Sequence, residues 1–187
     1  MFGARRLQLA ALIPWLLTGQ SAAAHPHLWV TLRGEIVFSL DGKIDSLRYV
    51  WAFDESLTAS VTTRTSETTT TREELASLAQ ANIDALKNSR FFTRAISDGH
   101  ELKFASPEDY WMSLEKGLLT LHFALPFAGQ IKPVLLELDI VDPSYFTDIK
   151  LAEHIPFVLI NAPPQCTLQT YRQTWMRTEN RIIVTCP

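Results

Sequence analysis

The chain has 187 residues, of which 47% are hydrophobic and 20% are charged, with a formal net charge of −3. This is the composition of an ordinary globular protein rather than of a disordered chain. The mildly acidic balance argues against a nucleic-acid-binding protein and against binding to anionic membranes, because both favour basic surfaces.

Residues 1–24 have the three parts of a secretory signal peptide. Arg5 and Arg6 form the positive region, residues 7–17 form a short apolar region, and Ala22, Ala23 and Ala24 form a small-residue cleavage site. Cleavage leaves one domain, residues 25–187, with 15 basic and 20 acidic residues. No later apolar run reaches the ~18 residues of a membrane helix, so we expect an exported protein with no stable membrane insertion after cleavage.

Cleavage before His25 produces a cluster of nitrogen donors at the new N-terminus. The free amine, the imidazole of His25 and the imidazole of His27 gather within three residues. Pro26 has no N–H, which excludes a chelate built from successive deprotonated amides and favours an amine–imidazole clamp with His27 alongside. The alternative is that both histidines are simply solvated.

Residues 28–53 predict a β-hairpin that turns at Asp41-Gly42. If Leu40 pairs with Lys43, the numbers of opposed residues sum to 83. Apolar residues then meet on one face, and Glu35 meets Arg48 on the other. The apolar pairs are Ile36 with Leu47, Leu32 with Trp51 and Val30 with Phe53.

The same register brings acidic residues to the N-terminal end of the domain. It sets Trp29 opposite Asp54 and His27 opposite Ser56, so His27 and Asp54 become diagonal neighbours. Asp54 or Glu55 is therefore the candidate oxygen donor for a terminal metal, or the group that orients a histidine ligand.

Residues 57–61 are either a short helix or an irregular turn, and residues 62–71 form a threonine-rich loop. A helix is predicted after them, near residues 72–88. Thr71 and Glu74 fit a capping box at the start of the helix. Its apolar residues recur at helical spacing and predict packing against a sheet. They are Leu75, Leu78, Ala79, Ile83 and Leu86.

Short alternating segments with turns at Asp98-Gly99 and Lys116-Gly117 predict an antiparallel sheet. The segments are residues 92–96, 100–104, 110–114, 118–125, 134–140, 155–160, 166–171 and 181–186. If residues 118–125 pair with 134–140, His122 faces Glu137 as a surface ion pair. The predicted fold class is α+β, mainly antiparallel, arranged as a meander or a sandwich around one principal helix.

Cys166 and Cys186 are the two cysteines of the chain. After export to an oxidising compartment they are expected to form a disulfide, which would stabilise the domain by roughly 3 kcal/mol in the chain-entropy model. A thiolate metal site is the alternative, and the wide spacing without a nearby histidine disfavours it.

Six motifs in order resemble the bacterial periplasmic family called domain of unknown function 1007. They are His25-Pro26-His27-Leu28-Trp29-Val30, Trp51-Ala52-Phe53-Asp54-Glu55, Asn88-Ser89-Arg90-Phe91-Phe92-Thr93, Pro107-Glu108-Asp109-Tyr110, Gly117-Leu118-Leu119-Thr120-Leu121 and Asp142-Pro143-Ser144-Tyr145-Phe146. The resemblance implies a periplasmic component of an ABC-type transport system, and a role beside nickel or cobalt transporters.

The chain departs from the family pattern at two places. Family members often carry an acidic calcium-loop-like segment before the helix, where this chain has threonines and the single acid Glu67 among residues 62–71. Hydroxyl groups without carboxylates bind calcium poorly, so no calcium site is expected. Thr31 stands where the family often has Asp.

Three functions compete on these residues. The first is binding or delivery of a divalent transition metal (nickel, cobalt, copper or zinc) to a membrane metal transporter or ABC-type permease, through His25 and His27 with Asp54 or Glu55. The second is an enzyme, for which the chain has no nucleophile motif, phosphate loop or zinc-protease motif, so that a redox-active terminal copper is the remaining route. The third is a metal-free module that docks on an envelope partner.

Overall fold

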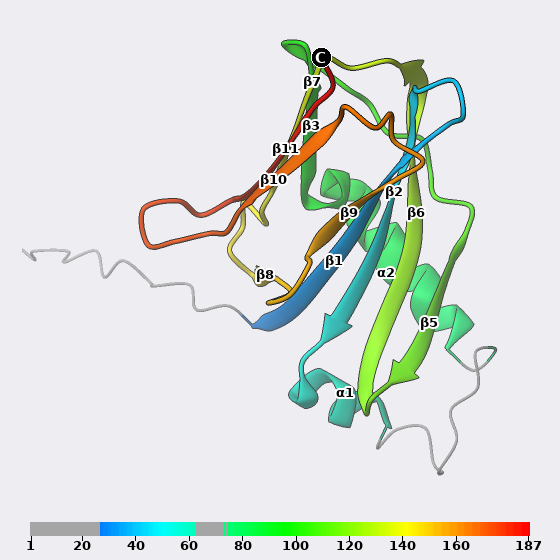
Figure 1. The fold of residues 1–187 in the computed structure, drawn as a ribbon. Helices are drawn as coiled ribbons and strands as arrows, with labels where there is room; N and C mark the ends of the chain where they lie inside the picture. Colours follow the sequence, from blue (N-terminus) through cyan, green and yellow to red (C-terminus); the bar gives the residue numbers. More distant parts are fainter. Residues whose placement is uncertain (1–26, 63–72, 74) are drawn as a thin grey trace, which may run out of the picture.

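The computed structural model describes residues 27–62, 73 and 75–187 and has the α+β, mainly antiparallel fold that the sequence predicts. The larger of two sheets has the order β5-β6-β2-β1-β8, with β9 also paired to β1 (Figure 1). Its strands are β1 (Leu28–Phe38), β2 (Ile44–Phe53), β5 (Tyr110–Glu115), β6 (Leu118–Ile131), β8 (Thr147–Leu151) and β9 (Phe157–Ile160).

The smaller sheet has the order β10-β11-β7-β3-β4. Its strands are β3 (Thr93–Ser97), β4 (His100–Glu101), β7 (Leu135–Ile140), β10 (Thr167–Tyr171) and β11 (Asn180–Thr185). The helical elements are α1 (Glu55–Thr62), α2 (Ala76–Asn88) and the short 3-10 turn η1 (Arg90–Phe92). Among the residues described, no helix is long and apolar enough to cross a membrane.

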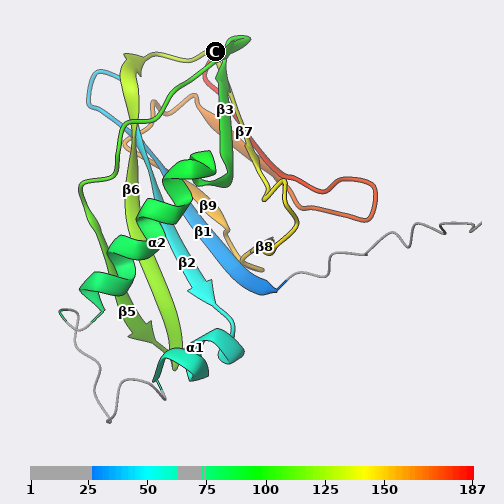
Figure 2. The ribbon, with the colours of Figure 1, turned by 180° about the vertical axis from the view of Figure 1, so that it is seen from behind.

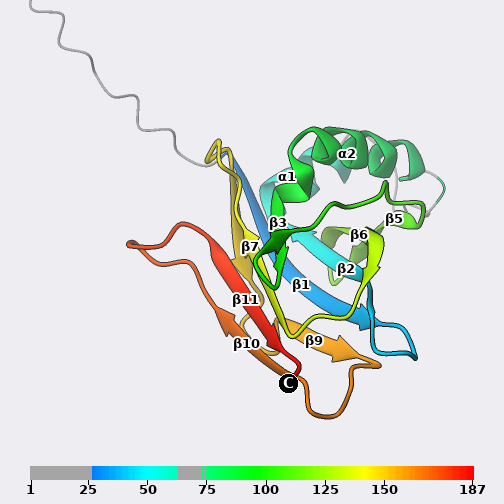
Figure 3. The same ribbon diagram turned by 90° about the horizontal axis from the view of Figure 1, so that it is seen from above.

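The two sheets meet where β8 contacts β11 and β9 contacts β10, and α2 lies against the larger sheet beside β5 (Figure 3). Figure 2 shows α2 lying across the strands of that sheet. Apolar side chains from both sheets and from α2 form one buried cluster, which is the hydrophobic effect's main contribution to stability here. The largest buried side chain in it is Trp51.

The first hairpin has the predicted register over most of its length. Val30 pairs with Phe53, Leu32 with Trp51, Ile36 with Leu47 and Glu35 with Arg48. The turn itself differs from the predicted two-residue turn.

A three-residue turn replaces it, because the N–H of Ser39 donates to the carbonyl of Lys43 at 2.8 Å. Gly42 takes the positive φ of +77° that such a turn requires at its last position, and the register shifts between Val37 and Phe38. Leu40 is therefore 98% exposed at the tip instead of pairing with Lys43.

Helix α2 presents the predicted apolar face to the core. Leu75, Ala79, Ile83 and Leu86 are buried, and Leu78 is half-buried. The predicted capping residues Thr71 and Glu74 lie outside the described residues, as does most of the threonine-rich stretch. The segment at residues 57–61 is helical, within α1.

Two sequence expectations about strand pairing are wrong. Strands β6 and β7 do not pair, because β6 lies between β2 and β5 whereas β7 lies between β11 and β3 in the other sheet. His122 therefore does not face Glu137, and its Nε2 lies 2.8 Å from the Glu115 carboxylate. Strand β8, which was not predicted, pairs in parallel with β1.

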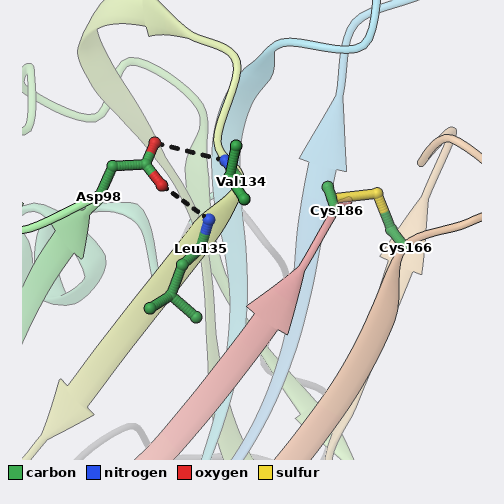
Figure 4. The surroundings of a disulfide bond; sticks show 5 residues. All are labelled: Asp98, Val134, Leu135, Cys166 and Cys186. Carbon is green, nitrogen blue, oxygen red and sulfur yellow. Dashed lines mark hydrogen bonds between the residues drawn. A yellow bond between two sulfur atoms is a disulfide. The ribbon is translucent and has the colours of Figure 1, made fainter.

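The disulfide predicted between Cys166 and Cys186 is present and joins the start of β10 to the end of β11 (Figure 4). Close to the disulfide, the start of β7 is held by Asp98. Its carboxylate accepts the backbone N–H groups of Val134 and Leu135 at 3.3 and 2.8 Å. The hydrogen bond from Leu135 is the main reason that the pKa of Asp98 lies below its ordinary value.

The second edge of β1 is occupied by β8 and β9 in succession, both parallel to it. Between them, the N–H of Ala152 donates to Leu32 and the N–H of Gly34 donates to Pro156, so the ladder continues through the connection. Gly34 also admits the ring of Phe157, since a Cβ built on Gly34 would lie 2.2 Å from that ring. Glycine is required here by close approach rather than by backbone angle.

Replacing Gly34 by Ala should therefore lower the free energy of unfolding by about 1–3 kcal/mol, as overpacking does in a well-filled core. Chemical denaturation would measure the loss. Gly129→Ala is the matched control in β6, because a Cβ there meets nothing within 4 Å. Similar effects of the two substitutions would contradict the account of the Gly34–Phe157 contact, as would an equal Gly34→Ala effect in a Phe157→Leu background.

Candidate functional site

His27 is the first described residue and lies at the surface at the start of β1. Its N–H donates to the carbonyl of Phe146 at 2.9 Å, and the N–H of Leu28 donates to the same oxygen at 3.2 Å. The imidazole ring contacts the ring of Phe146, with the ring centres 5.2 Å apart. His25, the other predicted ligand, lies outside the described residues.

The turn that holds Phe146 is fixed by a buried carboxylate. Asp142 accepts the N–H of Ser144 at 2.8 Å, its hydroxyl at 2.6 Å and the N–H of Thr147 at 2.9 Å. Burial opposes ionisation of Asp142, but these hydrogen bonds outweigh it, so the pKa of this carboxyl lies below its ordinary value. The backbone that positions His27 is therefore rigidly supported.

Asp54 lies beside Trp29 as the register predicts, since its N–H donates to the carbonyl of Trp29 at 3.2 Å. Strand β2 ends at Phe53, so the predicted pairing of His27 with Ser56 does not form and Ser56 lies in α1 instead. The carboxylate of Asp54 accepts the N–H of Leu57 at 2.8 Å, which makes Asp54 the N-cap of α1.

Glu55 is exposed in the first turn of α1, where a negative charge is favourable to the helix dipole. The structure thus brings His27, Asp54 and Glu55 to the same end of the β1–β2 hairpin, but the His27 ring contacts Phe146, on the β8 side of β1, whereas Asp54 lies on the β2 side. Within the described part of the chain, no three His, Cys, Asp or Glu side chains gather closely enough to hold a metal ion. The predicted ligand set includes His25 and so extends beyond this part.

The capping role of Asp54 can be separated from its charge. Asp54→Ala should lower the free energy of unfolding by about 1 kcal/mol because it removes the cap, whereas Asp54→Asn should be nearly neutral because Asn caps helices about as well as Asp. Urea denaturation with a chelator present would measure both without interference from metals. Equal losses in the two variants would mean that the charge, rather than the cap, is what α1 needs.

A second candidate site, not anticipated from the sequence, is a shallow pocket of about 310 Å³ on the outer face of the larger sheet. The rings of Trp111 and His122 stack along its wall with centres 4.6 Å apart and planes 3° apart. Arg33 lies across β2 from His122, since both pair with Val50. Arg33 lines this pocket, and its guanidinium is a donor of the kind that binds anionic groups.

Comparison with models of protein families finds a match over residues 10–181, to the family described as "Protein of unknown function (DUF1007)". The match spans nearly the whole chain, including every element described above except most of β11. A search of the curated proteins finds no match.

Proposed function

The chain belongs to the DUF1007 family of proteins of unknown function, and we propose that it is a periplasmic protein that binds or delivers a divalent transition metal for a membrane transport system. The metal is held at the mature N-terminus by the amine and imidazole of His25, with His27 beside them. Nickel, cobalt, copper and zinc all accept nitrogen and oxygen ligands of this kind.

The observation that carries this proposal is the position of His27. Its imidazole is exposed and, among the described residues, takes part in no hydrogen bond, so a ring nitrogen is available as a ligand. Its backbone is fixed by the bond to Phe146, so a metal bound here is held at a defined place on the domain.

Asp54 and Glu55 are the proposed oxygen donors or orienting groups. Only one oxygen of the Asp54 carboxylate accepts a hydrogen bond in the part of the chain described, which leaves the other available to a metal or to an imidazole N–H. Glu55 is exposed and unpaired there, so its side chain can turn toward the terminus.

Titration of the mature protein, residues 25–187, with each of the four metals tests the proposal. The expected result is one site whose affinity falls strongly in His25→Ala and in His27→Ala. His154→Ala is the matched control, because His154 is an exposed histidine on a different loop. An undiminished affinity in the double His25→Ala/His27→Ala variant would place the site elsewhere and contradict the proposal.

The free amine and the pH give two further readouts. One added residue before His25 should weaken binding, because it moves the amine away; unchanged affinity would exclude the amine and leave an imidazole site. Binding should also weaken as the pH falls through ~6.5, where histidines ordinarily take up a proton and lose the lone pair that binds metal. Asp54→Asn, which keeps the helix cap, should weaken binding only if the carboxylate contacts the metal or its ligand.

A second candidate function is a metal-free binding module that docks on a transporter or another envelope partner. The pocket lined by Arg33, Trp111 and His122 favours it, since a guanidinium next to stacked rings can recognise an acidic, planar group. A mature protein that binds none of the four metals would leave this candidate in place and eliminate the first.

A further inference from the structure

The tip of the β10–β11 hairpin carries two large apolar side chains in water. Trp175 is 89% exposed and Met176 is 76% exposed. They are the two central residues of a tight turn, closed by backbone hydrogen bonds between Thr174 and Arg177 at 2.7 and 3.1 Å. Figures 1 and 3 show this turn projecting from the body of the protein.

Neither the turn nor the core requires these residues. Tight turns favour Gly, Asn, Asp, Pro and Ser at their central positions, and Trp and Met confer none of the conformational properties of those residues. Burial contributes nothing either, because both side chains are in solvent. Their presence is therefore explained by something that covers them.

The base of the hairpin is held firmly, so the exposure of its tip does not come from a loose loop. Arg172 donates to the carbonyls of Leu151 and Ala152 at 2.6 Å. Gln173 donates to the Asp148 carboxylate at 2.6 Å, and the buried Asn180 donates to the carbonyl of Ile149 at 2.7 Å. These bonds fix the hairpin to β8 and point its tip in one direction.

The other strongly exposed aromatic residues of the described chain lie at the same end. Tyr145 and Phe146 are each 53% exposed, and Tyr145 lines a cavity of about 230 Å³ with Thr174 of the hairpin. Trp29 pairs with Asp148, to which the hairpin is bonded. We call this set the aromatic end: Trp29, Tyr145, Phe146, Tyr171, Trp175 and Met176.

The charge of the tip is opposite to that of the chain. Residues 171–178 include Arg172 and Arg177 and no acidic residue, although the chain as a whole is acidic. The guanidinium of Arg177 lies 5.5 Å from the centre of the Tyr171 ring, which keeps this cation beside the aromatic side chains. Aromatic rings with adjacent arginines match the interfacial layer of a phospholipid bilayer, which has an apolar boundary under a layer of phosphate.

We propose that the aromatic end docks on the surface of a phospholipid bilayer, with Trp175 and Met176 inserted among the headgroups and Arg177 against phosphate. The proposal does not depend on metal binding.

Vesicle flotation with the mature protein tests it, using vesicles of phosphatidylethanolamine and phosphatidylglycerol. The wild type should float with the vesicles, and Trp175→Ser/Met176→Ser should lower the partition coefficient roughly tenfold or more, because two large apolar side chains no longer leave water. Leu40→Ser is the matched control: Leu40 is 98% exposed at the tip of the β1–β2 hairpin, so its loss should leave partition unchanged.

The side chains of Leu40, Trp175 and Met176 are in solvent and that of Arg177 is partly exposed, so circular dichroism should show unchanged folding in every variant. Arg177→Gln should reduce binding to these vesicles more than binding to purely phosphatidylcholine vesicles, since both contain phosphate but only the former carry net negative charge. A wild type that does not float, or a Trp175→Ser/Met176→Ser variant that floats equally well, would overturn the proposal. So would a concentration-dependent dimer that the double variant abolishes, since the end would then be an interface between two copies.

Discussion

The close contact between Gly34 and Phe157 is the constraint on which the end of the molecule that holds His27 depends. It lets β9 lie against β1, and the hydrogen bonds of Ala152 and Gly34 extend this pairing without a break toward β8. Strand β8 in turn carries the turn that holds His27, and its carbonyls anchor the β10–β11 hairpin through Arg172. The absence of a side chain at Gly34 thus allows the strand packing that positions both the predicted metal site and the aromatic end.

Local patterns in the sequence predicted local structure well. The alternation of residues 30–53 was sufficient for the register of β1 and β2, because a shift by one residue would turn every apolar side chain to the solvent. The turn type was missed, since Asp41-Gly42 is compatible with a two-residue turn and with a three-residue turn that has Gly42 last. The spacing of Leu75, Ala79, Ile83 and Leu86 was sufficient for α2, and a predicted export signal with two cysteines was sufficient for the disulfide.

The pairings that join distant segments were not predictable in the same way. Strand β8 follows a turn and alternates only over Thr147, Ile149 and Leu151, a pattern too short to indicate which strand it joins. Segments β6 and β7 are neighbours in sequence and both alternate, which favours a hairpin between them. Strand β7 instead belongs to the smaller sheet, where its first residue, Leu135, donates a hydrogen bond to Asp98 of the Asp98-Gly99 turn. At the candidate site, the sequence predicted that His27 and Asp54 lie at the same end of the β1–β2 hairpin. It did not predict that Asp54 caps α1 or that the His27 ring contacts Phe146. A Trp-Met pair in a polar stretch between two strands was the available signal for the hairpin tip.

The central claim is that the start of β1 is where this protein binds a transition metal. Paramagnetic broadening of backbone amide signals by substoichiometric Cu²⁺ tests it most directly, because broadening falls steeply with distance from the metal. The account predicts that signals of His27–Trp29, of the turn at Ser144–Phe146 and of the start of α1 broaden first. Signals of the turn at Leu40, roughly 40 Å away along β1, should stay sharp. Broadening centred on His100 or His154, or none at all, would contradict it.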